Sequence, residues 1–149
     1  MGSNISQPRK VVPKTGFEIE IDGIGNVHAE SCGVLEQELS LIMIHEGGAR
    51  TVVQQSTNKY KTTPIEIKRP LDIADRKVAQ WFAASKKGQD QRNGTFYYVA
   101  NGERVAKRAI EQMNITKHSD GEGDAKADED PQLEVFTVVP QELGDLEAM

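Results

Sequence analysis

Two pairs of carboxylates have the spacing that places both side chains on one face of a β-strand. Glu18 and Glu20 form the first pair, and Glu36 and Glu38 form the second. Two neighbouring carboxylates can act as the general acid and general base of a hydrolase that cleaves sugars or peptides. Such a site needs a desolvated carboxyl group, and the flanking sequence suggests no desolvating partner. We therefore expect both pairs to form the solvated face of their strands, and keep a hydrolase as the weaker alternative.

Residues that could bind a metal or act as a nucleophile are few and scattered. His28, His45 and His118 lie far apart and have no companion at the spacing of a zinc site. The single cysteine, Cys32, excludes an internal disulfide and cannot form a thiolate metal site alone. The sequence contains no nucleophile elbow, phosphate-binding loop or dinucleotide-binding glycine motif. We expect no cofactor, no metal and no enzymatic activity.

The acidic segment 118–131 begins like a calcium-binding loop. Asp120, Glu122 and Asp124 alternate as the first ligands of an EF-hand do. An alanine and a proline then replace the glycine and the bidentate glutamate that this loop requires. Because like charges repel and keep such a segment open, we expect a solvated acidic loop.

Length and composition indicate a single domain with a lean core. The chain has 149 residues, of which 37% are hydrophobic and 5% aromatic, with a mean hydropathy of −0.55. A core this lean suggests help from partner subunits. The net charge of −5 argues against a general attraction to nucleic acid or to an anionic membrane. No run approaches the roughly 20 apolar residues of a membrane span, and no signal peptide is recognisable, so we expect folding in the cytosol without membrane binding.

Alternating residues predict three strands in the first half of the chain. They cover 17–21, 35–44 and 64–68, where apolar side chains recur at every second position. One face of the second strand changes from charged to apolar along its length, so we expect both faces to be covered near its end. The mostly polar residues 46–61 predict a long exposed loop. Residues 1–16 carry lysine and arginine but no acid, and predict a mobile basic arm.

Helical periodicity appears at about residues 72–87. Val78, Trp81 and Phe82 fall on one face of this helix and are its expected core anchors. Asp72 is a suitable N-terminal cap, and two lysines followed by a glycine suit the C-terminus. We therefore expect one helix packed across a sheet.

Further strands are predicted after the helix. Asn101 and Gly102 favour the tight turn of a β-hairpin. Residues 105–116 also fit a helical stripe, but we favour a strand because the turn supplies a partner. A final strand is predicted at 133–139.

The order of the elements is strands, helix, strands, with no internal repeat. This order predicts a mainly β protein: a two-sheet antiparallel sandwich or barrel with one flanking helix. The domain spans 17–143, and residues 144–149 form a short acidic tail.

Four motifs, in this order and spacing, resemble the tail tube family of contractile phage tails and related contractile injection systems. They are FEIEIDG at 17–23, EGG at 46–48, KYKTTPIEIKR at 59–69, and the helix tryptophan, Trp81. The resemblance covers roughly residues 15–143, and type VI secretion tube proteins share the same architecture.

The resemblance implies a structural protomer. Hexameric rings would stack into a hollow tube inside a contractile sheath, with strands of six subunits closing one barrel around the lumen. In a phage the tube would conduct DNA on contraction; the alternatives are the inner tube of an injection system that carries protein effectors, or a stand-alone β-sandwich binding module. The implied partners are further copies, the sheath, the baseplate or tape-measure proteins and the tail terminator. The implied location is a virion tail, assembled in the bacterial cytoplasm.

The resemblance also suggests roles for three groups of residues. The loop would contact neighbouring subunits or rings through Gly47, Gly48, Arg50, Val52, Val53, Gln54, Asn58, Lys59 and Tyr60. The basic arm would contact an adjacent ring or the sheath through Arg9, Lys10 and Lys14. A wet face, lining the lumen or the exterior, would consist of Glu18, Glu20, Glu36, Glu38 and Ser40.

Overall fold

The computed structural model describes residues 16–45, 47, 52–120 and 132–149. The elements are β1 (Phe17–Ile21), β2 (Gly25–Val27), β3 (Ser31–Cys32), β4 (Gln37–Ile44), β5 (Val53–Thr62), β6 (Ile65–Pro70), α1 (Lys77–Lys87), β7 (Arg92–Ala100), β8 (Glu103–Ser119), β9 (Leu133–Val139), β10 (Glu142–Leu143) and β11 (Glu147–Ala148). The predicted mainly β fold with one helix is confirmed.

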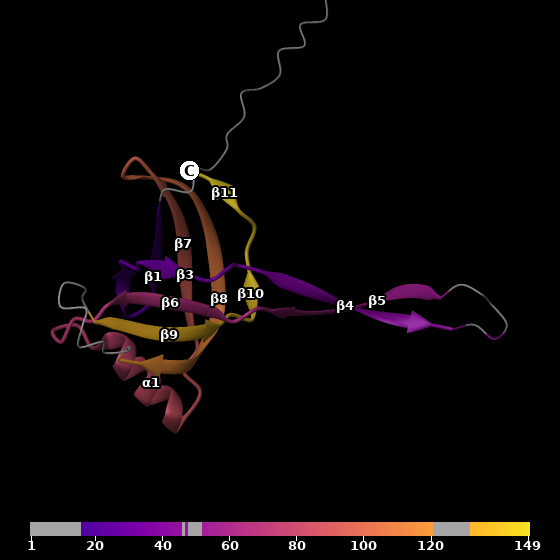
Figure 1. Cartoon of the computed structure of the whole chain (residues 1–149), viewed down its shortest axis with the longest axis horizontal. Coiled ribbons are helices and arrows are strands. Elements are labelled where there is room, and N and C mark those ends of the chain that lie inside the picture. Colours follow the sequence, from indigo (N-terminus) through magenta and orange to yellow (C-terminus); the bar gives the residue numbers. More distant parts are fainter. Residues whose placement is uncertain (1–15, 46, 48–51, 121–131) are drawn as a thin grey trace, which may run out of the picture.

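Two antiparallel sheets make up the described chain. The large sheet has the order β2-β1-β7-β8-β9-β6-β3, and β10 and β11 also pair with β8. The small sheet contains β4 and β5 alone. We call β4 and β5 the exposed hairpin and the rest of the described chain the body. Figure 1 shows the hairpin projecting from the body as a separate arm.

The large sheet folds over itself because β8 belongs to both of its halves. The first part of this 17-residue strand pairs with β7, and its last part pairs with β9. Between the two parts, Gln112 has a positive φ of 52° and its amide donates to the side chain of Asn93. In Figure 1, β7 and β8 accordingly run across the direction of β6 and β9. The strand expected at 105–116 is confirmed, because it has a partner on each side.

The body core lies between these two halves of the sheet and α1. The alternation of the first strand buries Ile19 and Ile21, as predicted. The other fully buried side chains of the core come from strands of both halves and from the helix: Val27, Ile65, Ile67, Val78, Trp81, Ile110, Met113, Phe136 and Val138. A continuous core of this kind stabilises the body without a partner.

The helix begins at Lys77, later than the predicted residue 72. Oδ1 of Asp72 accepts a hydrogen bond from the amide of Ala74, and Oδ1 of Asp75 accepts one from Lys77, so these carboxylates cap local turns ahead of the helix. The predicted anchors Val78 and Trp81 are fully buried, and Phe82 packs half-buried against the core. The helical part of the described chain is neither long nor apolar enough to span a membrane.

The loop predicted at 46–61 is wrong for most of its length. Residues 53–62 form β5, which pairs antiparallel with β4, and only residue 46 and residues 48–51 lie outside the described chain. The strand was missed because neither face of it is buried in the body, so its sequence lacks apolar alternation. The tail assigned to 144–149 is also part of the sheet, since β11 pairs with β8.

The turn predicted at Asn101 and Gly102 is confirmed, with positive φ angles of 53° and 77° between β7 and β8. The predicted acidic loop falls mainly on residues 121–131, which lie outside the described chain, whereas residues 118–119 belong to β8.

Candidate functional site

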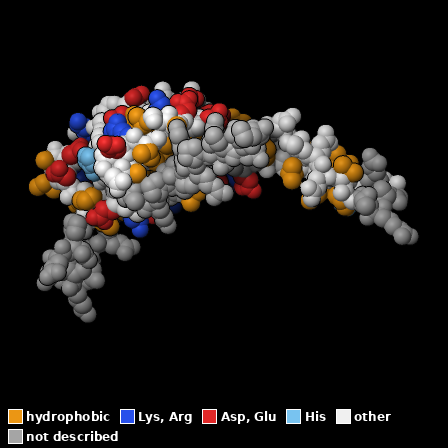
Figure 2. All heavy atoms as spheres, turned by 90° about the horizontal axis from the view of Figure 1, so that it is seen from above, with side chains coloured by type: hydrophobic (Ala, Val, Ile, Leu, Met, Phe, Trp, Pro, Cys, Tyr) orange, Lys and Arg blue, Asp and Glu red, His pale blue; other side chains and the backbone are white. Residues whose placement is uncertain are grey.

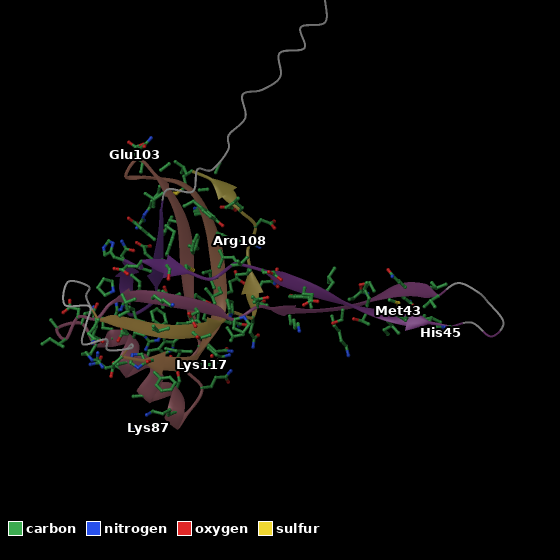
Figure 3. All side chains as sticks on the ribbon, in the orientation of Figure 1. Met43, His45, Lys87, Glu103, Arg108 and Lys117 are labelled. Carbon is green, nitrogen blue, oxygen red and sulfur yellow. The ribbon has the colours of Figure 1, made fainter. Side chains whose placement is uncertain are left out.

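The exposed hairpin carries apolar side chains that the body does not cover. Six large apolar side chains of β4 and β5, and Val52 directly before β5, are between 43% and 61% exposed. The six are Leu39, Leu41, Ile42, Met43, Val53 and Tyr60. Figure 2 shows apolar side chains along the projecting arm, and Figure 3 shows Met43 and His45 towards its far end. Exposed apolar residues concentrated on one element mark an interaction site rather than an ordinary surface.

Both faces of the hairpin carry exposed apolar side chains. Leu41 and Met43 point to one face, and Ile42 points to the opposite face because neighbouring strand residues alternate. The far half of the predicted second strand is therefore uncovered on both sides in the single subunit. The expectation that both faces are covered fails within one chain, and a partner would have to supply the cover.

A bulge on β5 divides the hairpin into two parts. Leu39 pairs with Tyr60, whereas Leu41 pairs with Ser56, so β5 contains two more residues than β4 over this interval. Asn58 takes a positive φ of 59° inside the bulge. Such a bulge increases the local twist of a two-stranded ribbon, and it re-aims the far part of the hairpin.

One carboxylate binds both strands of the hairpin where they leave the body. Glu142 on β10 accepts a hydrogen bond from Nε2 of Gln37 at 3.0 Å, and its other oxygen accepts one from the hydroxyl of Tyr60. These two donors, with Tyr60 the stronger, lower the pKa of Glu142. The same contact raises the pKa of Tyr60, so the phenol stays protonated.

The predicted wet face is split between two places. Glu18 and Glu20 lie on β1 in the body, half-buried, where Arg104 of β8 binds both. The guanidinium contacts Glu18 at 2.8 Å and Glu20 at 3.3 Å, and lies over the ring of Tyr97. Hydrogen bonds to Glu18 and then Glu20 raise the pKa of Arg104. This pair is thus an ion-paired surface cluster.

The other predicted residues of the wet face lie on the hairpin or directly before it. Glu36 directly precedes β4, and Glu38 lies on it, 4.0 Å from Nζ of Lys61 across the strand pair. Ser40 follows on the same strand, and its backbone carbonyl accepts a hydrogen bond from Thr57. All three are exposed.

A buried ionic cluster joins three strands to the start of the helix. Glu134 is fully buried, and its Oε1 accepts a hydrogen bond from Nε of Arg69 at 2.6 Å. Its Oε2 lies 3.6 Å from Nη1 of Arg76, as an ion pair, and 3.0 Å from Nε2 of His118. Sequence reasoning missed this site. The sequence does contain one indication of it: Glu134 is a carboxylate on the same face of β9 as the buried Phe136 and Val138.

The cluster also contains the donor set that comes nearest to a metal site. Ligand atoms of His118, Asp120 and Glu134 lie within 4.8 Å of one another. Arg76 contacts both Asp120 and Glu134, and Arg69 binds Glu134 more closely. Two guanidinium groups therefore already supply the positive charge that a cation would bring, and the donor set does not fit a metal.

Burial raises the pKa of the Cys32 thiol to about 12, as suits an unreactive side chain packed on the core. In the loop group, Gly47, Val52, Val53, Gln54, Asn58, Lys59 and Tyr60 are exposed. Arg9, Lys10, Lys14, Gly48 and Arg50 lie outside the described residues.

Comparison with known proteins places this geometry in a family. The family of the T4-like virus tail tube protein gp19 matches residues 13–129. No curated protein matches the sequence.

Solved structures share the fold at low sequence identity. The sheath/tube terminator of an extracellular contractile injection system, PVC, superposes with a TM-score of 0.78 and 14% identity, over 95% of this chain and 100% of that one. The PVC sheath-tube complex gives a TM-score of 0.79 and 13% identity, over 95% and 94%. Hcp1 from Flavobacterium johnsoniae gives 0.54 and 10% identity, over 89% and 98%. Because the family match covers most of the sequence, the chain belongs to the T4-like virus tail tube protein family.

Proposed function

We propose that this chain is the structural protomer of a contractile tail tube. Six copies form a ring, and the rings stack into a hollow tube inside a sheath. The observation that carries this proposal is the exposed hairpin, whose apolar side chains lie open on both faces. A head-to-tail contact that closes within a ring and repeats between rings produces a tube of fixed diameter.

The occupant of the hairpin surface is a second copy of the same chain. A two-stranded sheet leaves two open edges and two uncovered faces, and the hairpin of every neighbouring copy presents the same two edges. Closing strands around a ring removes such edges. The contact residues are Gly47, Gly48, Arg50, Val52, Val53, Gln54, Asn58, Lys59 and Tyr60.

The charged groups serve the other surfaces of the tube. Arg9, Lys10 and Lys14 contact an adjacent ring or the sheath, because the rest of the chain carries the excess of acid. The wet face lines the lumen, where the exposed carboxylates of Glu36 and Glu38 keep a passing polyanion from binding. The baseplate, the tape-measure protein and the terminator contact the two ends of the tube.

The cargo we propose is DNA, conducted on contraction, since the matching family is that of a viral tail tube. A second candidate, an inner tube that carries protein effectors, is favoured by the fold similarity to structures of an extracellular contractile injection system. Purified particles separate the two: nuclease-protected DNA in an attached capsid supports the first, and capsid-free particles that contain protein in the lumen support the second.

Electron microscopy of the purified protein tests the assembly. We expect hollow rods or rings, and we expect Leu41→Glu with Met43→Glu to abolish them. Ile73→Glu is the matched control, because Ile73 is 86% exposed in the body, outside the hairpin. A protein that stays monomeric at high concentration contradicts the proposal, as does a double variant that assembles normally.

A further inference from the structure

The exposed hairpin projects from the body, and its side-chain hydrogen bonds to the body gather at one place. Its two strands pair with each other and, among the described strands, with no strand of the body. At the base, the amide of Thr63 donates to the carbonyl of Glu36, which closes the ladder but does not tie it to the body. Besides the chain connections to β3 and β6, the hairpin is held to the body by hydrogen bonds to Gln141 and Glu142.

This segment is a fixed point on the body. The backbone of Glu142 pairs with Glu111 on β8, and Leu143 is buried in the core beside Ile110. The amide of Gly144 donates to Ala109 at 2.8 Å, and Nε of Arg108 donates to the carbonyl of Gly144 at 2.7 Å. Figure 3 shows Arg108 beside this strand. The backbone that carries Glu142 is therefore held to the sheet.

The Glu142 carboxylate holds the hairpin by both of its strands. Oε1 accepts from Gln37 of β4, and Oε2 accepts from Tyr60 of β5. Oε1 also accepts from the amide of Leu143 at 3.1 Å, which orients the carboxylate towards the hairpin. Two ties on opposite strands resist rotation of the ribbon about its axis, whereas a tie to one strand leaves a pivot.

A weaker second contact supports the same joint. Thr62 is 8% exposed, and its hydroxyl lies 3.5 Å from the carbonyl of Gln141 and 3.4 Å from Nε2 of Gln37. Glu142 therefore lies at the centre of a polar joint between hairpin and body.

We propose that Glu142 is the positioning residue that fixes the direction of the exposed hairpin relative to the body before subunits join. The consequence for assembly rests on the proposed function; the joint itself does not. Removal of the carboxylate leaves both strands of the hairpin folded but frees the arm to swing.

Distances between two spin labels measure this directly. Two labels, at Gln54→Cys on β5 and Ala84→Cys on α1, are placed in a Cys32→Ala background. They report the position of the arm against the body in the unassembled 149-residue chain. We expect a narrow distance distribution in the wild-type joint and one at least twofold wider in Glu142→Ala. Tyr60→Phe, which removes one tie, is expected to widen it less.

Two further variants separate positioning from folding or charge. In Glu142→Gln the side-chain amide can still accept a hydrogen bond from Gln37 and donate one to the Tyr60 oxygen. We therefore expect a distance distribution almost as narrow as that of the wild-type joint. Glu147→Ala removes the same charge from β11 and should change nothing. An unaltered thermal midpoint in Glu142→Ala, with Trp81 still buried by fluorescence, keeps the comparison within folded protein.

The outcomes decide separately on the joint and on the tube. An equally narrow distribution in Glu142→Ala overturns the proposal. A wide distribution with slower tube growth supports it, and a wide one with unchanged growth confines the role to the free subunit and overturns its consequence for assembly. If wild-type protein forms no tube while Glu142→Ala widens the distribution, the proposed function fails and the joint stands.

Discussion

The body and the exposed hairpin both consist of strands with apolar side chains, but the body buries these side chains and the hairpin exposes them. In the body, Ile19, Ile67 and Val138 are at most 1% exposed, whereas Leu41, Ile42 and Met43 on the hairpin are at least 51% exposed. Apolar burial stabilises the body within one chain, and the same kind of side chain is left open on the hairpin. Exposure of the hairpin is therefore a property of the single subunit, which association would remove.

The largest expected contrast is in stability. Trp81→Ala removes a fully buried indole whose Nε1 donates to the carbonyl of Asp90 at 2.7 Å. We expect a loss of about 3–5 kcal/mol in the free energy of unfolding. Leu41→Ala on the hairpin should change it by less than about 0.5 kcal/mol. Denaturant unfolding of unassembled protein measures both, and equal losses would show that the hairpin is part of the core.

Ion pairs should show a similar contrast at smaller magnitude. Arg69→Met breaks a contact with the fully buried Glu134 and leaves that carboxylate poorly compensated, at an expected cost of about 3 kcal/mol. Lys61→Met removes an ion pair of the hairpin whose side chains are 77% and 65% exposed, and should cost under about 0.5 kcal/mol. The same unfolding experiment compares them. A negligible effect of Arg69→Met would mean that the buried cluster adds nothing to the body.

Association should reverse the ranking of the two regions. Each exposed hairpin side chain that becomes fully buried contributes about 1.5–3 kcal/mol to the contact. Leu41→Ala should therefore raise the critical concentration for tube growth roughly tenfold, while Ile73→Ala in the body leaves it unchanged. Light scattering against protein concentration gives both values, and identical curves would remove the distinction.

The smallest expected effect is the pH dependence of the joint between the regions. The folded pKa of Glu142 lies below its usual value of 4.5, because the ionised carboxylate accepts from Tyr60 and Gln37 and faces Arg108. Its contribution is thus complete above pH 4.5 and is lost as pH falls through the lower folded pKa. The spin-label distribution should widen only in that acid range. Glu142→Ala, already wide, should stay constant, and an equal response in the variant would assign the effect to another group.

The main strands of the body could be predicted from the sequence because each of them, such as β1, β6 and β9, buries one face. Alternation located the first strand with Ile19 and Ile21, and the turn at Asn101 and Gly102 located the central hairpin. The helix was found by its anchors, although Asp72 was assigned to its start when it closes a preceding turn.

The candidate site was harder to predict because its signals depend on partners outside the periodic pattern. Residues 53–62 form a strand with no buried face, so no alternation marks it. The role of Glu142 depends on Tyr60, 82 positions away, and that of Glu134 depends on Arg69, 65 positions away. Pairing over such distances follows from the topology of the sheet, which a single sequence does not state.

In the proposed tube, the hairpin is covered by further copies of the chain. The most direct test is a cryo-electron microscopy reconstruction of the assembled particle. We expect a hollow tube of stacked six-membered rings in which Leu41, Ile42 and Met43 are buried against a neighbouring subunit. A reconstruction in which these side chains face solvent or the lumen, with rings held by other surfaces, would contradict the account.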